Sequence, residues 1–156
     1  MNEVLAVPAL RFSEFDGAWG QHRLNQVTSK IQDGTHFSPE LADNGAFKYI
    51  TSKNIRQGYL DLGNVDHISE IAHRDIYRRC DVKFGDVLLT KDGASTGACC
   101  LNTLDEEFSL LSSVAFVRAK SGTAIGGFIF FALSSSIGQK QIFESVAGQA
   151  ITRITC

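Results

Sequence analysis

The sequence lacks any apolar run long enough to cross a membrane. The longest candidate, Ile125 to Leu133, is less than half of the roughly 20 residues that a spanning helix requires. The N-terminus, Met1 to Val4, has no basic region before an apolar stretch, which argues against a secretory signal. We therefore expect a cytoplasmic protein with no membrane partner.

Paired metal-binding cysteines are also lacking. Cysteines stand at positions 80, 99, 100 and 156 without a C-x-x-C spacing, so the sequence indicates neither a disulfide framework nor a zinc ribbon. Buried free thiols are the favoured interpretation. A metal site that uses His67 or His73 is the weaker alternative, and we predict no metal and no cofactor.

A strong excess of positive charge is the third absence. The formal net charge is −2, which argues against a protein that coats nucleic acid indiscriminately. Bases nevertheless outnumber acids by eight to six in residues 48–91 and by four to one in residues 118–156. This distribution suits a protein that contacts DNA over a limited face, although an ordinary solvated surface gives the same pattern.

What is present is an ordinary globular composition, with 156 residues, 44% hydrophobic and 21% charged. A chain of this length can bury one core. We predict a single domain that covers residues 1–156.

The segment from Lys83 to Gly97 is the most informative stretch. Gly85-Asp86 is typical of a turn, and the apolar run Val87 to Leu89 predicts a short buried strand. A polar loop, Lys91 to Gly97, follows, and Ala98 to Leu101 predicts the second strand of a hairpin. The loop lacks the spacing of a P-loop, which argues against nucleotide hydrolysis. We expect its backbone amides to contact a nucleic-acid backbone or base edge instead.

Periodicity and turn signals predict the remaining elements. Three rings, Phe12, Phe15 and Trp19, are expected to anchor an extended N-terminal arm onto the body. The expected helices are 23–31, 69–80 with Ser69 as its cap, a buried helix at 123–133, and a further helix that ends at Ala147. The expected strands, beside those of the hairpin, are 47–51 and 108–117.

Two polar segments leave functional alternatives open. Asp33 and His36 have the side chains of a catalytic pair, but hydrogen bonding within their own loop is the favoured interpretation. Lys53, Asn54 and Arg56 can pair with base edges or phosphates, and a plain polar turn is equally compatible with them. A small enzyme with Cys99 or Cys100 as nucleophile, and a protein-interaction module without a nucleic-acid role, are the competing classes.

Several stretches together resemble the target recognition domain of the specificity subunit of Type I restriction-modification systems. They are Val7 to Phe12 with Phe15 and Trp19, Asp33 to His36, Tyr49-Ile50 with Asn54-Ile55 and Gly58, Phe84 to Leu88 with Lys91 to Gly93 and Gly97, and Ala147 to Ala150 with Ile154-Thr155. The resemblance spans nearly the whole chain.

The resemblance implies an α+β fold, a mixed twisted sheet with short helices, that reads one half of a split double-stranded DNA target. It implies no catalysis by this chain, because methyl transfer and cleavage belong to the methyltransferase (modification) and restriction subunits that a specificity subunit directs. Family members usually carry two recognition domains and long spacer helices. We expect this sequence to represent one recognition domain, without the second domain and the spacer helices.

The predicted DNA-binding residues come from loops that must converge on one face. They are Thr35, His36, Lys53, Asn54, Arg56, Lys91, Asp92, Ser95, Thr96, Gln149, Thr152 and Arg153.

Overall fold

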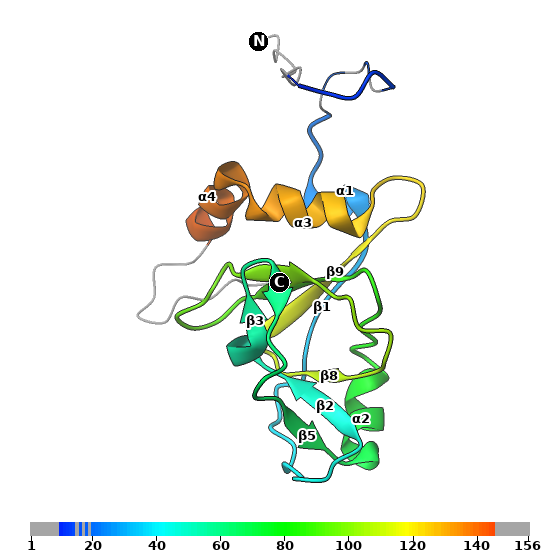
Figure 1. Cartoon of the computed structure of the whole chain (residues 1–156), viewed down its shortest axis with the longest axis vertical. Helices are drawn as coiled ribbons and strands as arrows, with labels where there is room; N and C mark the ends of the chain where they lie inside the picture. Colours follow the sequence, from blue (N-terminus) through cyan, green and yellow to red (C-terminus); the bar gives the residue numbers. More distant parts are fainter. Residues whose placement is uncertain (1–9, 15, 17, 19, 146–156) are drawn as a thin grey trace.

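The computed structural model describes residues 10–14, 16, 18 and 20–145, and these form an α+β fold of small sheets and short helices (Figure 1). The helices are α1 (Leu24–Val27), α2 (Glu70–Tyr77), α3 (Gly126–Ser134), α4 (Ser136–Glu144) and the 3₁₀ helix η1 (Ser52–Asn54). The strands are β1 (Thr28–Asp33), β2 (Phe47–Ile50), β3 (Ile55–Arg56), β4 (Tyr59–Leu60), β5 (Asp66–Ile68), β6 (Val87–Thr90), β7 (Cys99–Leu101), β8 (Ser109–Leu110) and β9 (Val114–Ala119).

A four-stranded antiparallel sheet, with the order β1-β9-β6-β7, lies at the centre of the fold. Every residue of β6 is buried, as expected for a strand with neighbours on both edges and packing on both faces. β6 pairs with β7 and places Leu89 opposite Cys99. The predicted strand and hairpin are therefore confirmed.

This sheet separates two apolar clusters. Leu88 and Phe116 belong to the cluster on one face, whereas Val87 and Val117 belong to the cluster on the other, together with Ile129 of α3. The alternation follows from the two-residue period of a strand. Helices α3 and α4 thus cover one face, and the smaller sheets lie on the other (Figure 1).

A second sheet has the order β5-β2-β8, and β3 and β4 form a separate hairpin. The predicted strand at 47–51 is confirmed as β2. Helix α2 packs against β8, and the Ser69 hydroxyl caps it by accepting a hydrogen bond from the backbone N–H of Ala72. The predicted capped helix is confirmed, although it ends at Tyr77.

The helix predicted at 23–31 is wrong beyond its first turn. Helix α1 ends at Val27, and the chain continues as β1. β1 pairs with β9 and places Ile31 opposite Val117. These long-range backbone hydrogen bonds outweigh the helical spacing of three apolar residues, because local propensity is a weak preference.

Three further predictions are corrected. Residues 108–117 form two strands, β8 and β9, which belong to different sheets and are joined by a turn at residues 111–113. Helix α3 is not buried all round, since Ile129 is its one buried residue. Phe12 is 75% exposed and therefore does not anchor the arm, whereas Phe15 and Trp19 lie outside the described residues.

In the part of the chain that the structure describes, no helix combines the length and apolar character that crossing a bilayer requires. Within the same residues, no three His, Cys, Asp or Glu side chains gather as a metal site. His73 is instead fully buried, stacked on Phe47 with ring centroids 3.7 Å apart, and its Nδ1 lies 3.0 Å from the Ser109 hydroxyl.

Candidate nucleic-acid interface

The turn at residues 111–113 is where three of the predicted polar segments meet. The carbonyl oxygen of Ser113 accepts a hydrogen bond from the backbone N–H of Lys91 at 2.9 Å, and its hydroxyl accepts one from the N–H of Ser52 at 3.3 Å. The N–H of Ser112 donates to the carbonyl oxygen of Thr35 at 2.9 Å. One turn therefore holds the ends of the loops that begin near Thr35, Ser52 and Lys91.

Gly34 allows the first of these loops to approach so closely. The N–H of Thr35 donates to the carbonyl oxygen of Leu110 at 2.8 Å. A Cβ atom at Gly34 would overlap the backbone of Leu110 and Leu111. Only glycine permits two backbones to pack at this separation.

Lys91 is buried beneath the candidate interface. Its side chain is 4% exposed, and its Nζ atom lies 3.0 Å from Oδ2 of Asp33. Burial alone would raise the pKa of Asp33, but the hydrogen bond and charge of Lys91, assisted by His36 and Arg79, hold the pKa below its usual value. The Lys91 ammonium therefore holds the 91–97 loop to the end of β1 and is not exposed in this structure, whereas its role as a DNA contact stays a prediction.

Asn54 is also turned inward, with 1% of its surface exposed. Its Oδ1 accepts a hydrogen bond from the N–H of Thr51 at 3.1 Å, and its Nδ2 donates to the carbonyl oxygens of Asp61 and Asn64 at 3.1 and 3.0 Å. The amide thus ties together the segment 51–64. The pairing of Asn54 with bases or phosphates stays a prediction, and in this structure its amide is occupied by these hydrogen bonds.

Lys53 and Arg56 flank Asn54 and point outward, with side chains that are 42% and 48% exposed. The Nζ atom of Lys53 lies 2.7 Å from Asp66, and Nε of Arg56 lies 3.4 Å from Asp61. Exposed ion pairs of this kind contribute little stability, about 0–1 kcal/mol. Both cations are therefore accessible to a ligand that carries negative charge.

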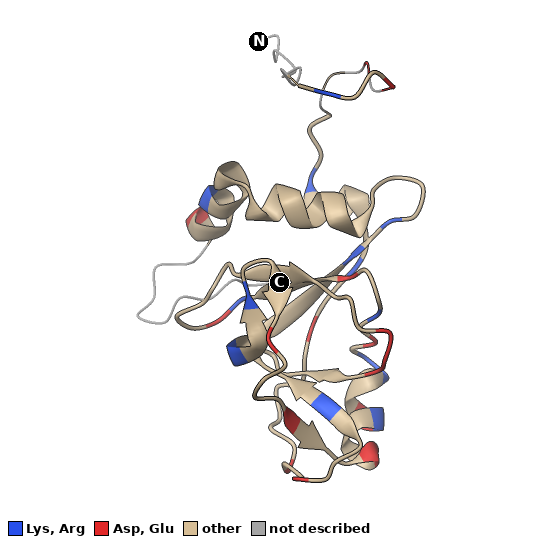
Figure 2. Ribbon diagram, in the orientation of Figure 1, with Lys and Arg blue, Asp and Glu red and all other residues tan. Residues whose placement is uncertain are grey.

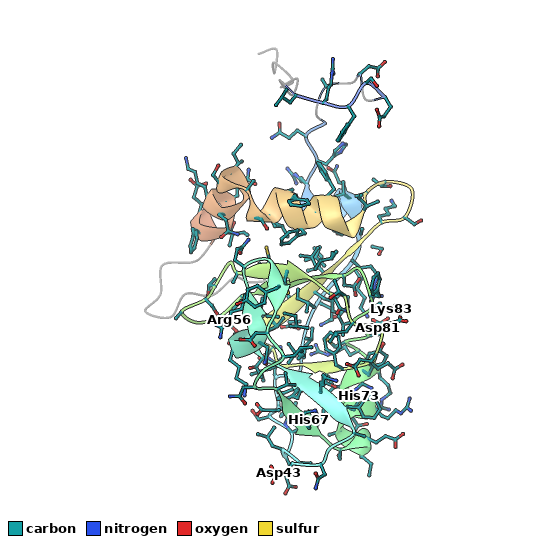
Figure 3. The ribbon with its side chains drawn as sticks, in the orientation of Figure 1. Asp43, Arg56, His67, His73, Asp81 and Lys83 are labelled. Carbon is teal, nitrogen blue, oxygen red and sulfur yellow. The ribbon has the colours of Figure 1, made fainter. Side chains whose placement is uncertain are left out.

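The β3–β4 hairpin lies against β7, the strand that follows the 91–97 loop. The N–H of Gly58 donates to the carbonyl oxygen of Cys99 at 2.9 Å, and the N–H of Cys99 donates to Oε1 of Gln57 at 3.3 Å. Figure 2 shows the basic residues of η1 and β3 on the same side of the molecule as the loop that follows β6, and Figure 3 labels Arg56 there. In this view, two of the predicted segments lie on the same side of the molecule.

The 91–97 loop is a compact turn with an exposed tip. The Thr96 hydroxyl donates to the carbonyl oxygen of Gly93 at 2.7 Å, and Thr96 is 7% exposed. Gly93 has a φ of +94°, in the left-handed region that favours glycine. Asp92 and Ser95 are half-buried, whereas Gly93 and Ala94 are exposed. The tip of the loop is thus the part that faces solvent.

The loop from Thr35 combines a local turn with an exposed histidine. The Thr35 hydroxyl accepts a hydrogen bond from the N–H of Phe37 at 3.2 Å, which is the local bonding that the sequence favoured. The side chain of His36 is 49% exposed, and its Nε2 lies 3.1 Å from Oδ2 of Asp33.

A cavity beside this loop was not predicted. It has a volume of about 550 Å³ and lies between the loop and α2. Its lining residues are Thr35, His36, Phe37, Pro39, Ala72, Asp75, Ile76 and Arg79. Arg79, which donates from Nη2 to the carbonyl oxygen of Gly34 at 2.8 Å, lies two residues after the end of α2. Its approach to Gly34 depends on the tertiary fold, because the two residues are 45 positions apart in the sequence.

The proposed thiol nucleophiles have the wrong environment for catalysis. Cys99 and Cys100 are fully buried. Burial raises the pKa of Cys100 to about 12 and also raises the pKa of Cys99. Reactive cysteines need a lowered pKa and some exposure, so the small-enzyme alternative loses its nucleophile.

The third predicted segment, with Gln149, Thr152 and Arg153, lies outside the described residues. Helix α4, which precedes it, contacts the 91–97 loop. Nε2 of Gln139 donates to the carbonyl oxygen of Gly97 at 3.0 Å.

Comparison with known proteins gives a match at the level of the fold. No family model and no curated protein matches the sequence. Among solved structures, the chain is similar to the S subunit of a Type I restriction-modification system from M. genitalium, with a TM-score of 0.54 and 15% sequence identity. The match covers 86% of this chain and 30% of the S subunit. The predicted α+β fold, like that of a target recognition domain, is thereby confirmed.

Proposed function

We propose that this chain is a sequence-specific DNA-binding module of a Type I restriction-modification specificity subunit. It recognises one half of a bipartite target and directs partner methyltransferase and restriction subunits. The observation that carries this proposal is the likeness of its fold to that of a Type I S subunit. The convergence of its polar loops on the turn at 111–113 gives independent support.

In this proposal, exposed groups contact DNA and buried groups hold them in place. Lys53, Arg56 and His36 supply positive or titratable side chains, and the tip of the 91–97 loop approaches the duplex through its backbone. Asn54 and Lys91 fix the two loops from below. Asp92, Ser95 and Thr96 shape the loop, and Gln149, Thr152 and Arg153 remain predicted contacts.

DNA binding requires positive charge, and in this proposal a few exposed cations supply it, although the protein as a whole is not basic. Lys53 and Arg56, which are themselves exposed, exchange their half-buried partners, Asp66 and Asp61, for phosphates or guanine at little cost. A bidentate arginine contact with a base contributes about 1–3 kcal/mol of discrimination. Such a module needs few cations, because sequence-specific contacts supplement the phosphate contacts.

The test is selection of bound sites from randomised duplexes with the purified chain, first alone and then with a methyltransferase subunit. We expect enrichment of one short sequence. Lys53→Ala and Arg56→Ala should each weaken binding of that sequence by roughly 5–150-fold, the equivalent of about 1–3 kcal/mol. Arg74→Ala is the matched control, because Arg74 is an exposed arginine that pairs with Glu70 on α2.

Absence of any enriched sequence, both alone and with the methyltransferase subunit, would refute sequence-specific recognition. Equal losses in Arg74→Ala and Arg56→Ala would show that binding depends on total charge and not on the proposed surface.

A further inference from the structure

The cavity between α2 and the loop that begins at Thr35 has the size of a small-molecule site. Its volume of about 550 Å³ falls within the roughly 300–1,000 Å³ that ligand pockets in proteins occupy. Its lining residues come from two segments, 35–39 and 72–79, that are far apart in the sequence. The tertiary fold brings both segments around one hollow.

The surface of this cavity is mostly apolar. Phe37 and Pro39 line it from the loop, and Ala72 and Ile76 line it from α2. Ala72 and Ile76 are four residues apart, so they lie on the same face of the helix. Phe37 is 84% exposed, and its ring offers a flat surface on which a ligand ring can stack. Such walls favour a ligand with an apolar body.

The charged groups beside the cavity carry an excess of positive charge. Asp33 lies between two cations: Nζ of Lys91 is 3.0 Å from Oδ2, whereas Nη1 of Arg79 is 3.8 Å from Oδ1. Two permanent cations thus share one carboxylate. Asp75, an acid that lines the cavity, is paired with Arg78 and does not change this balance. A ligand with one negative charge would neutralise the excess.

The guanidinium of Arg79 also retains hydrogen-bonding capacity. It has five N–H donors, and among the described residues it makes one hydrogen bond, from Nη2 to the carbonyl oxygen of Gly34 at 2.8 Å. Its side chain is 53% exposed. An arginine can hold a carboxylate or a phosphate through two parallel hydrogen bonds. His36, which is 49% exposed and lines the same cavity, can contribute a further hydrogen bond.

We propose that this cavity binds a small organic acid, with its apolar body between Phe37 and Ile76 and its carboxylate or phosphate group at Arg79. A phosphate of a DNA backbone would use Arg79 but would leave the apolar walls empty. The inference does not depend on the DNA-binding proposal, although the cavity shares Thr35 and His36 with the residues predicted to contact DNA.

The test is an NMR titration of the ¹⁵N-labelled full chain, without DNA, with phenylacetate, phenyl phosphate and the neutral analogue phenylacetamide. We expect saturable shifts of the amide signals of residues 35–39 and 72–79, with a dissociation constant of about 1 mM or lower for at least one of the two acids. The acid that binds more tightly identifies the anionic group. Phenylacetamide should bind at least roughly tenfold more weakly than that acid, because hydrogen bonds to a charged group are stronger than neutral ones.

Three variants separate the contribution of charge from that of space. Arg79→Met should raise the dissociation constant of the acid by roughly tenfold or more. Ala72→Phe, which fills the cavity from α2 and keeps Arg79, should also raise it by roughly tenfold or more. Arg74→Met is the matched control and should change it by less than about twofold, because Arg74 is an exposed arginine of α2 that pairs with Glu70. Circular dichroism checks that each variant is folded.

The wild-type titrations alone can overturn the inference, so it remains testable even if a variant fails to fold. Absence of saturable shifts with either acid up to about 10 mM would overturn it. Equal affinity for phenylacetamide and the acids would exclude a role for Arg79, and inorganic phosphate bound as tightly as phenyl phosphate would exclude a role for the apolar walls. Either result would also overturn the inference. Because these titrations contain no DNA, their failure would leave the DNA-binding proposal to its own test.

Discussion

Replacing Lys91 by methionine tests whether this lysine is a structural residue or a DNA contact. The substitution keeps most of the side-chain volume but removes the ammonium that lies 3.0 Å from Asp33, a carboxylate that is itself 13% exposed. Removing one partner of a buried ion pair costs about 3–5 kcal/mol. His36 and Arg79 remain close to Asp33, so we expect a smaller loss, about 2–3 kcal/mol in the free energy of unfolding.

Urea denaturation followed by circular dichroism measures this loss, which corresponds to a fall in Tm of about 5–10 °C for a chain of this size. Lys140→Met is the control, because Lys140 has a side chain that is 76% exposed, and should change stability by less than about 0.5 kcal/mol. In the double variant Asp33→Asn/Lys91→Met, part of the loss should be recovered, since the unpaired carboxylate is gone.

The same pair predicts a pH dependence. The pKa of Asp33 is lowered in the folded protein. The ionised carboxylate of Asp33 therefore contributes its full stabilisation to the free energy of unfolding above the unfolded-state pKa of about 3.9. That contribution disappears as the pH falls through the lower folded-state value. The difference in stability between wild type and Lys91→Met should therefore narrow below about pH 4.

The reasoning would be refuted if Lys91→Met kept wild-type stability and lost DNA affinity. That result would return Lys91 to the set of direct contacts. We expect the opposite result. Lys91→Met should be less stable than the wild type and should bind DNA with unchanged affinity at temperatures where it is folded.

Three further predictions concern buried groups. Within the described part of the chain, the buried Tyr49 hydroxyl has no hydrogen-bond partner, so Tyr49→Phe should leave the unfolding free energy unchanged or raise it by up to about 1 kcal/mol. Burial raises the pKa of Tyr49 to about 12, so wild type should lose stability between about pH 10 and 12, and the variant should lose less. Gly34→Ala should destabilise the protein by about 1–3 kcal/mol, because the added Cβ overlaps Leu110. Gly127→Ala is the control and should not destabilise the protein, because its Cβ would meet nothing within 4 Å. Thermal melts of both variants measure the difference. Cys100 should react with a thiol reagent at pH 7 only as fast as the protein unfolds, and equally fast reaction with and without denaturant would contradict its burial.

Local sequence signals were sufficient for part of the fold. The run Val87 to Leu89 between turn residues predicted β6, and Ser69 predicted the start of α2, because both signals act within a few residues. β1 was missed because its strand character depends on pairing with β9, about ninety residues further along the chain. The exposure of Phe131 could not be predicted either, since an apolar helical run looks the same in the sequence whether it lies in a core or at the surface.

In the candidate site, too, local sequence signals indicate the segments but not the direction of each side chain. The polar residue types around Lys53 and Lys91 singled out these two loops as candidates, and the turn at 111–113 holds both of them together. Sequence could not distinguish the outward Lys53 from the inward Lys91, because burial of Lys91 depends on Asp33, which is 58 positions away. Asn54 is directed inward by partners of its own segment, namely the N–H of Thr51 and the carbonyl oxygens of Asp61 and Asn64.

The salt dependence of binding tests the central claim most directly. Fluorescence anisotropy would compare the selected duplex with a scrambled duplex of equal length between low and moderate salt. We predict tighter binding of the selected duplex at every salt concentration, and a logarithmic salt slope that Arg56→Ala or Lys53→Ala reduces by about one if the residue contacts a phosphate. Equal affinity for both duplexes, or an affinity that salt does not change, would contradict a DNA-reading surface on this face of the molecule.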